Sequence, residues 1–295
     1  MESTNLRQAS AKITVVGTLS DMELTPQKAD NGTEFIEGYL TIKTSDKNFV
    51  RFNVRANKFK KDTNDISSVY TGICTVKNEY KSISEVGEEL ADKLSVTGEI
   101  NPYTKPQTNV TVVGYRSNFF NRYKGDNFEG DKKSEFAIEL FVSQIIDEVN
   151  KEGEETGRKL VKGWLPTYNG IEPITLVAED KDVVSGLDEY EAGQTVTFYG
   201  EAINNSIKIV KEIPVKLGKP RQEISYENRN ELVITGATEP YEEGCPMGEP
   251  YEIEAIKKAI QERQNALEAA KNTPKTTTSA NPSAAASGRK INLGF

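Results

Sequence analysis

Short runs of apolar residues that alternate with polar ones dominate the chain from Lys12 to about Thr235. The first five runs read KITVVGTLSDMEL, FIEGYLTIKT, NFVRFNVRA, KLSVTGEI and NVTVVGYRS, and Gly, Asn, Asp and Pro lie between them. A period of two in segments rich in β-branched and aromatic residues predicts half-buried strands. Residues 62–91 separate the third run from the fourth and are long enough for one helix or two short ones.

Five strands with a helical segment between the third and the fourth have the order of an OB-fold barrel. The pattern recurs loosely further along, where GQTVTFYGEAINN echoes DKLSVTGEINPY and KDVVSGLDEYEA predicts the helical segment. KIVKEIPVKL then precedes a closing strand, NELVITGATEPY. The sequence therefore predicts a mainly β protein with two tandem OB-fold-like five-stranded barrels, in residues 1–135 and 136–240.

A different pattern begins after the second predicted barrel. Pro250 suits the first turn of a helix, and apolar residues then recur at helical spacing, namely Ile253, Ile256, Ile260 and Leu267. These positions predict a C-terminal helix over residues 249–271 with a narrow apolar stripe.

The end of the chain has low complexity. Residues 272–287 contain no large apolar side chain, so we expect a disordered, flexible tail over residues 272–295. The tail closes with GRKINLGF, in which Ile291, Leu293 and Phe295 form a terminal hydrophobic motif. We expect this motif to bind a protein partner. The alternative is an end without a function.

Composition narrows the possible classes of function. The 295 residues carry a formal net charge of −8 and contain no apolar run long enough to span a membrane. The first ten residues lack the layout of a signal peptide, so we expect a cytoplasmic protein, in the host cytoplasm if it is viral. The chain has no histidine, which excludes Cys/His zinc sites and removes the commonest general base. No metal and no cofactor are expected.

Positive charge is concentrated in the first predicted barrel. Residues 11–135 hold 18 basic and 18 acidic side chains, whereas residues 136–235 hold 11 and 18. The segment KNFVRFNVRANKFKK, residues 47–61, contains no acid and places three phenylalanines among its basic residues. Phosphates require fixed positive charge, and unpaired bases stack on aromatic rings. This segment therefore predicts a surface for single-stranded nucleic acid.

Strand alternation assigns the side chains of that surface. Val50, Phe52 and Val54 should face the core, so that Arg51 and Arg55 face outward. The preceding strand should likewise turn Ile36, Leu40 and Ile42 inward and its aromatic rings outward. The outer face of the second and third strands is where OB-folds bind oligonucleotides.

Two further segments could extend this surface. YRSNFFNRYKG, residues 115–125, is a second acid-free cluster that could close over a bound strand, and Trp164 shares a strand face with Lys162 and Tyr168. The predicted nucleic-acid-binding residues are Phe35, Tyr39, Lys43, Phe49, Arg51, Asn53, Arg55, Lys58, Arg116, Phe119, Arg122, Tyr123, Lys124 and Trp164.

These assignments have plainer alternatives. The outward arginines and lysines could be an ordinary solvated strand edge, and Phe35 and Phe49 could pack against the second barrel. One of Phe119 and Phe120 should belong to the core. Trp164 could be core or interface, because an acidic barrel repels phosphate, and the second barrel would then have a supporting or protein-docking role.

The chain resembles OB-fold single-stranded DNA-binding proteins, and most of all the larger ones encoded by bacteriophages. The strand plan of residues 12–124, the strand NFVRFNVRANKF and the order of barrel, flexible linker and terminal Phe295 carry the resemblance. It implies cooperative, sequence-tolerant coating of unwound DNA during replication, recombination or repair, with a C-terminal tip that docks replication proteins. This tip departs from the family pattern, because Arg289 and Lys290 stand where the family has acids.

The sequence thus favours a non-catalytic single-stranded DNA-binding protein. The alternative is a virion or replisome structural or scaffolding protein that uses its OB-like barrels for protein contacts. An enzyme is disfavoured, because the sequence has no Walker loop, no metal-binding cluster, no GxSxG and no histidine. No residue is assigned a catalytic role.

Overall fold

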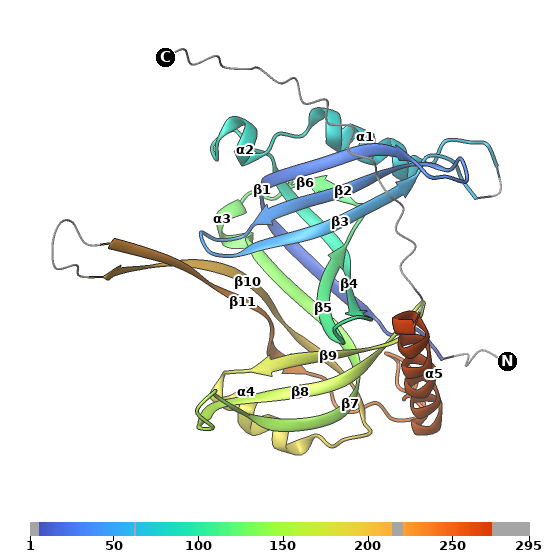
Figure 1. Cartoon of the computed structure of the whole chain (residues 1–295), viewed down its shortest axis with the longest axis vertical. Helices are drawn as coiled ribbons and strands as arrows, with labels where there is room; N and C mark the ends of the chain where they lie inside the picture. Colours follow the sequence, from blue (N-terminus) through green and yellow to red (C-terminus); the bar gives the residue numbers. More distant parts are fainter. Residues whose placement is uncertain (1–5, 62, 214–220, 273–295) are drawn as a thin grey trace, which may run out of the picture.

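The computed structural model describes residues 6–61, 63–213 and 221–272, and within these ranges it describes all side chains except those of residues 206–228 and of Asn272. The fold is mainly β, as the sequence predicts. Eleven strands form one sheet in the order β10-β11-β9-β8-β7-β1-β2-β3-β5-β4-β6, and two additional pairings, β1–β4 and β7–β10, close it into two rings (Figure 1). Within the described part of the chain, no helix is both long and apolar enough to cross a membrane.

The first ring has the OB-fold strand order predicted for this part of the chain. Antiparallel pairs connect β1 to β2, β2 to β3, β4 to β5 and β4 back to β1, while β3 and β5 pair in parallel. The helical segment between the third and fourth strands consists of α1 (Ser68–Glu79) and α2 (Ile83–Val86). The five strands are β1 (Ala11–Lys28), β2 (Glu34–Lys43), β3 (Phe49–Asn57), β4 (Lys93–Lys105) and β5 (Val110–Arg116).

The second ring repeats this topology, so the loose echo in the sequence reflects two barrels of one kind. Its third and fifth strands, β9 and β11, again pair in parallel, and β10 closes the ring on β7. The short helices α4 (Lys181–Gly186) and η1 (Leu187–Glu189) occupy the position of α1 and α2. The strands are β7 (Lys133–Val149), β8 (Glu155–Thr167), β9 (Gly170–Ala178), β10 (Thr195–Ile213) and β11 (Arg221–Ala237).

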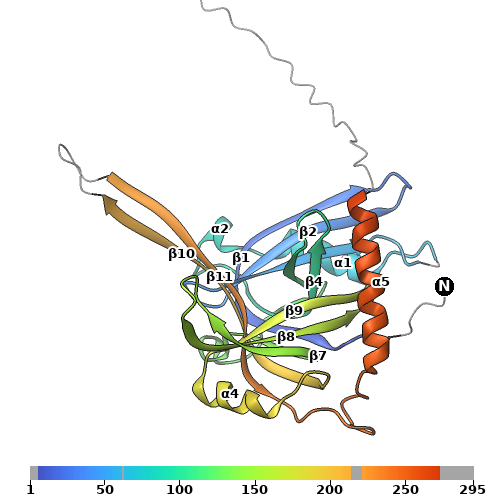
Figure 2. The ribbon, with the colours of Figure 1, turned by 60° about the horizontal axis from the view of Figure 1, so that its bottom comes forward.

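The prediction was wrong in three details. β10 runs on to Ile213, beyond the end of GQTVTFYGEAINN, and pairs with β11 in a two-stranded arm that leaves the ring (Figures 1 and 2). The C-terminal helix α5 (Ile253–Asn272) begins three residues after Pro250, so this proline precedes the helix instead of lying in its first turn. Two short elements, β6 (Phe120–Arg122) and α3 (Phe128–Asp131), were not predicted. The tail expected over 272–295, with its motif Ile291, Leu293 and Phe295, lies outside the described residues except for Asn272.

The two rings share one continuous sheet, because β1 pairs with β4 on one side and with β7 on the other. A second connection involves Asn48, in the turn between β2 and β3. Its side-chain nitrogen donates to Ser134 Oγ and to the carbonyl of Ala202, each at 3.1 Å, and its side-chain oxygen accepts from Asn204 N at 2.7 Å. The β2–β3 turn is thereby fixed against β10 of the second ring.

Strand alternation correctly separates core from surface in β2 and β3. Val50 and Phe52 are fully buried, and Ile36, Leu40 and Ile42 are buried with them. Gly38 lets β2 cross close to β1, since a Cβ atom there would lie 1.8 Å from the carbonyl oxygen of Glu23.

Candidate nucleic-acid interface

β2 and β3 present one wall of outward side chains, on which Arg51, Asn53 and Arg55 are all exposed. The strand register pairs Thr41 with Arg51, Tyr39 with Asn53 and Glu37 with Arg55, so the side chains lie in adjacent rows. The wall therefore brings together a tyrosine, two guanidiniums and an amide. This grouping is what strand alternation predicted for Tyr39 and the three residues of β3.

Both guanidiniums on the wall lie over aromatic rings. Arg51 Cζ is 3.5 Å from the centroid of the Tyr39 ring, and Arg55 Cζ is 4.0 Å from the centroid of the Phe35 ring. The Tyr39 hydroxyl donates to Asp21 Oδ2 at 3.1 Å, and this hydrogen bond raises the pKa of Tyr39. Tyr39 therefore stays neutral, and its ring is held in place beneath Arg51.

Phe35 does not offer the exposed ring that the alternation suggested. It is only 5% exposed, because Arg55 covers it. Phe49 is half-buried at the end of the wall, and its carbonyl accepts a hydrogen bond from Asn204 Nδ2 at 2.8 Å. Phe49 thus lies beside the second ring, which its backbone carbonyl contacts.

The end of β5 adds an arginine and an open aromatic ring to the wall. Arg116 pairs with Asn53 across the parallel β3–β5 contact, Ser117 N donates to Asn53 O at 3.2 Å, and Arg55 N donates to Asn118 Oδ1 at 3.3 Å. Phe119 follows and is 62% exposed, whereas Phe120 is buried. We call the set Tyr39, Arg51, Asn53, Arg55, Arg116 and Phe119 the cationic face.

Acids engage some of the predicted cations. Lys43 forms ion pairs with Glu88 at 2.8 Å and with Asp46 at 3.0 Å, and these carboxylates raise its pKa. Lys58 pairs with Glu34, which likewise raises its pKa. Arg51 and Arg116, in contrast, have no carboxylate within 4.0 Å among the residues that the structure describes. Of the three arginines on the cationic face, these two are thus without a carboxylate partner in the described part of the chain, whereas Arg55 pairs with Glu37.

The structure separates the rest of the 115–125 cluster from the cationic face. Arg122, in β6, pairs with Asp92 at 2.8 Å and donates to the carbonyl of Glu79 at the end of α1. Tyr123 hydrogen-bonds to Asp131 and packs on Phe128, while Lys124 is exposed in the same segment. β6 pairs with Leu94, Ser95 and Val96 of β4, near Glu99, which pairs with Arg116, but the acids beside α1 and in α3 hold Arg122 and Tyr123. Arg122, Tyr123 and Lys124 therefore do not join the face.

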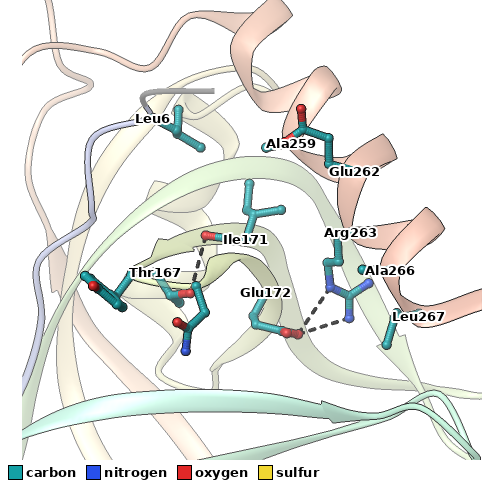
Figure 3. A pocket seen from close by; sticks show the side chains of 12 residues that line it. Leu6, Thr167, Ile171, Glu172, Ala259, Glu262, Arg263, Ala266 and Leu267 are labelled. Atoms are coloured by element: carbon teal, nitrogen blue, oxygen red, sulfur yellow. Dashed lines mark hydrogen bonds and ion pairs between the residues drawn. The ribbon is translucent and has the colours of Figure 1, made fainter. Parts of the chain in front are cut away.

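Trp164 lies in the second ring under a side chain from the C-terminal helix. Arg263 of α5 places its Cζ 5.7 Å from the Trp164 ring centroid. The same guanidinium forms an ion pair with Glu172 of β9 at 3.0 Å (Figure 3) and hydrogen-bonds to Thr104 of β4. Figures 1 and 2 show α5 beside β9 of the second ring. Trp164 is thus half-buried where three elements meet, as in the alternative of interface packing.

Two arginines of the second ring are neutralised by acids within the ring. Arg158 pairs with Glu231 at 2.6 Å and with Glu148 at 3.3 Å, and Arg229 pairs with Glu231 at 2.7 Å. Glu179 joins this network through Arg229. A phosphate would have to displace carboxylates here, so this network favours a structural role for the outer surface of β8, β9 and β11.

Sequence reasoning missed two polar residues beside the cationic face. Asn118 contacts the backbone of Arg55, and Lys12 of β1 lines the same hollow as Arg116. Asn118 lies within the acid-free cluster, so closer attention to its amide could have found it. Lys12 had no such signal, because it lies at the start of a strand whose other residues read as core.

The chain is similar to known proteins over most of its length. The model of the family described as YorF matches residues 10–273. The wild-type single-stranded DNA-binding protein from Thermus aquaticus overlaps 82% of this chain and 98% of its own, at 10% identity and a TM-score of 0.47. A deletion mutant of the same protein overlaps 81% and 98%, at 11% identity and a TM-score of 0.44. No curated protein matches the sequence.

Proposed function

The chain belongs to the YorF family, and we propose that it is a non-catalytic protein that binds single-stranded DNA through the cationic face. One observation carries the proposal: Arg51 lies over Tyr39 on the outer wall of β2 and β3, beside Arg116 and the open ring of Phe119. The wall of strands two and three is the ligand surface of OB-folds, and the end of β5 adjoins that wall in this protein.

The chemistry of the face fits an unpaired strand better than a duplex. Arginine can pair with phosphate and can also lie flat against a base, and Phe119 offers an aromatic surface to a neighbouring base. Stacking on aromatic rings requires bases that are not stacked in a helix. None of these contacts reads a base edge, so we expect binding that tolerates many sequences.

The proposal extends to the role of the protein in the cell. Sequence-tolerant binding would let the protein coat unwound DNA during replication, recombination or repair, in the manner of the bacteriophage proteins that the sequence resembles. Ile291, Leu293 and Phe295 would then recruit a replication or recombination protein. The alternative, a scaffold that uses its barrels for protein contacts, has support from the internally paired surface of the second ring.

The direct test is a titration with oligo-dT and with duplex DNA, followed by fluorescence at about 50 mM and about 200 mM salt. We expect tight binding to oligo-dT, weak binding to duplex, and an affinity that falls steeply as salt rises. Arg116→Ala should weaken oligo-dT binding and flatten the salt dependence. Lys181→Ala, which removes one exposed positive charge from α4 at the far end of the second ring (Figure 1), is the matched control. Affinity that is low and unaffected by salt would favour the scaffold.

A further inference from the structure

A groove leads away from the cationic face and into the space between the two rings. It consists of two hollows that share Lys12, Glu99 and Arg116. The first, of about 330 Å³, lies beside Phe119. The second, of about 440 Å³, extends to the β8–β9 turn of the second ring at Tyr168. We call these two hollows together the inter-ring groove.

The groove begins where the cationic face ends. Arg116 belongs to both, and Asn118, which lines the first hollow, accepts a hydrogen bond from the backbone of Arg55 at 3.3 Å. Phe119 stands at this junction and is 62% exposed. A strand that follows the wall of β3 would therefore reach the groove without crossing a covered surface.

An unusually exposed tyrosine marks the far end of the groove. Tyr168 is 89% exposed, although it lines the second hollow. Its position is set by the tight β8–β9 turn, in which Thr167 pairs with Gly170. A hydrogen bond of 2.9 Å from Ala9 N to Pro166 O also fixes the end of β8 to the segment that precedes β1. The backbone that carries Tyr168 is thus fixed in place, and the ring of Tyr168 is open to solvent.

The charge of the groove suits a polyanion, in contrast to the chain as a whole, which carries −8. Glu99 is its one acid among the described lining residues, and it pairs in register with Lys12 on β1 and with Arg116 on β5. Two cations therefore flank one carboxylate. The β8–β9 turn adds no acid, so the acidic second ring contributes neutral residues here.

We propose that bound single-stranded DNA leaves the cationic face at Phe119, passes over Arg116 and Lys12 in the inter-ring groove, and stacks a base on Tyr168. This inference rests on the proposed function. In this path the second ring contributes to the binding site through its β8–β9 turn. Trp164 keeps its structural role and does not contact the DNA. Phosphates would contact Lys12 and Arg116, and the base on Tyr168 would be the last one bound.

Binding measurements with two lengths of oligo-dT distinguish binding along the inter-ring groove from binding to the cationic face alone. An oligonucleotide of about 6 thymidines can occupy the face alone, whereas one of about 20 exceeds the site of one OB-fold. Tyr168→Ala should weaken binding of the long oligonucleotide about tenfold, which corresponds to the loss of one stacked base, and should leave the short one unchanged. Tyr168→Phe keeps the ring and should bind both as the wild type does.

Two further experiments test the role of the Lys12 charge and the position of the bound base. Lys12→Gln should reduce the salt dependence for the long oligonucleotide only, and Lys181→Gln is the matched control. Ultraviolet cross-linking of the long oligonucleotide, mapped by mass spectrometry, should place a thymine on Tyr168. The path is wrong if Tyr168→Ala binds both lengths like the wild type and no cross-link forms at the turn. Should the wild type bind neither length, the proposed function itself fails.

Discussion

The guanidinium of Arg51 lies over the ring of Tyr39, with 3.5 Å between Cζ and the ring centroid. The upper face of the tyrosine is therefore covered by the protein's own cation. A base that approaches this wall meets the flat guanidinium first and can stack on it, since arginine is planar and only weakly hydrated. The hydrogen bond from Tyr39 to Asp21 keeps the ring in place beneath. We infer that Arg51, supported by Tyr39, is the stacking surface.

This arrangement predicts different outcomes for two substitutions of Arg51. Arg51→Ala removes charge and plane together, so the affinity for short oligo-dT should fall about tenfold and the salt slope should decrease by about one. Arg51→Lys keeps the charge but loses the planar surface, so the slope should stay while the affinity falls. Equilibrium titrations over a series of salt concentrations measure both quantities. Full affinity in Arg51→Lys would show that Arg51 acts through charge alone.

An acid on the wall should restrain DNA binding. Glu37 lies 3.4 Å from the guanidinium of Arg55, and both side chains are partly exposed. Glu37→Gln removes a negative charge and releases Arg55 for phosphate, so affinity for oligo-dT should rise a few-fold at low salt and return toward the wild-type value at high salt. Glu129→Gln breaks a similar exposed ion pair with Lys132 in the α3 segment and should leave DNA affinity unchanged. Equal effects of the two substitutions would mean that only net charge matters.

The sequence predicted the fold well because alternation and turn residues are local signals. They place Ile36, Leu40 and Phe52 in the core, where the structure finds them. Such local signals do not predict contacts between residues that are far apart in the sequence. Lys43 meets Glu88 from 45 positions away, and Arg263 reaches Trp164 from a helix that follows the second ring. A side chain can thus point outward from its strand and still be held in an ion pair or covered by a side chain from a distant part of the sequence.

Phe35 illustrates a second limit of the alternation. It was assigned to the outer face, yet it is buried beneath Arg55 on the neighbouring strand. Alternation gives the direction of a side chain but not what lies above it. The length of β10 was missed for a related reason, because its second half pairs only with β11 and not with the barrel.

Burial of one tyrosine predicts a loss of stability at alkaline pH. Tyr115 is 8% exposed and packs on Phe52, and burial raises its pKa to about 12. In the unfolded chain its pKa is about 10. Between these values the unfolded chain releases the proton while the folded protein keeps it. The stabilising contribution is therefore fully present below about pH 10 and falls by about 3 kcal/mol as pH rises to about 12.

Tyr115→Phe keeps the packed ring and removes the titrating hydroxyl. Its free energy of unfolding, from urea denaturation, should decline less steeply than that of the wild type over this alkaline range. Tyr103→Phe changes a tyrosine that is 55% exposed on β4 and serves as the control. Parallel curves for the wild type and Tyr115→Phe would contradict the assignment.

The stability of the junction between the two rings and α5 should depend on one arginine, Arg263. Arg263 pairs with Glu172 at 3.0 Å and also hydrogen-bonds to Thr104, and its side chain is only 13% exposed. Arg263→Ala leaves the carboxylate of Glu172 without this partner in a partly buried place, so the free energy of unfolding should fall by about 2 kcal/mol. Urea denaturation measures this loss as a lower midpoint, and Trp164 fluorescence should change with it.

A double-mutant cycle separates the ion pair from the packing of the long side chain. If the two charges stabilise each other, Arg263→Leu should cost less in a Glu172→Leu background than in the wild type, because a buried charge left without its partner is more costly than two apolar neighbours. Equal costs in both backgrounds would assign the stability to packing alone. Short oligo-dT should bind all four proteins alike, because the cationic face lies on β2, β3 and the end of β5, away from this junction. A loss of short oligonucleotide binding in the Arg263→Leu and Glu172→Leu variants would instead show that the orientation of the rings shapes the face itself.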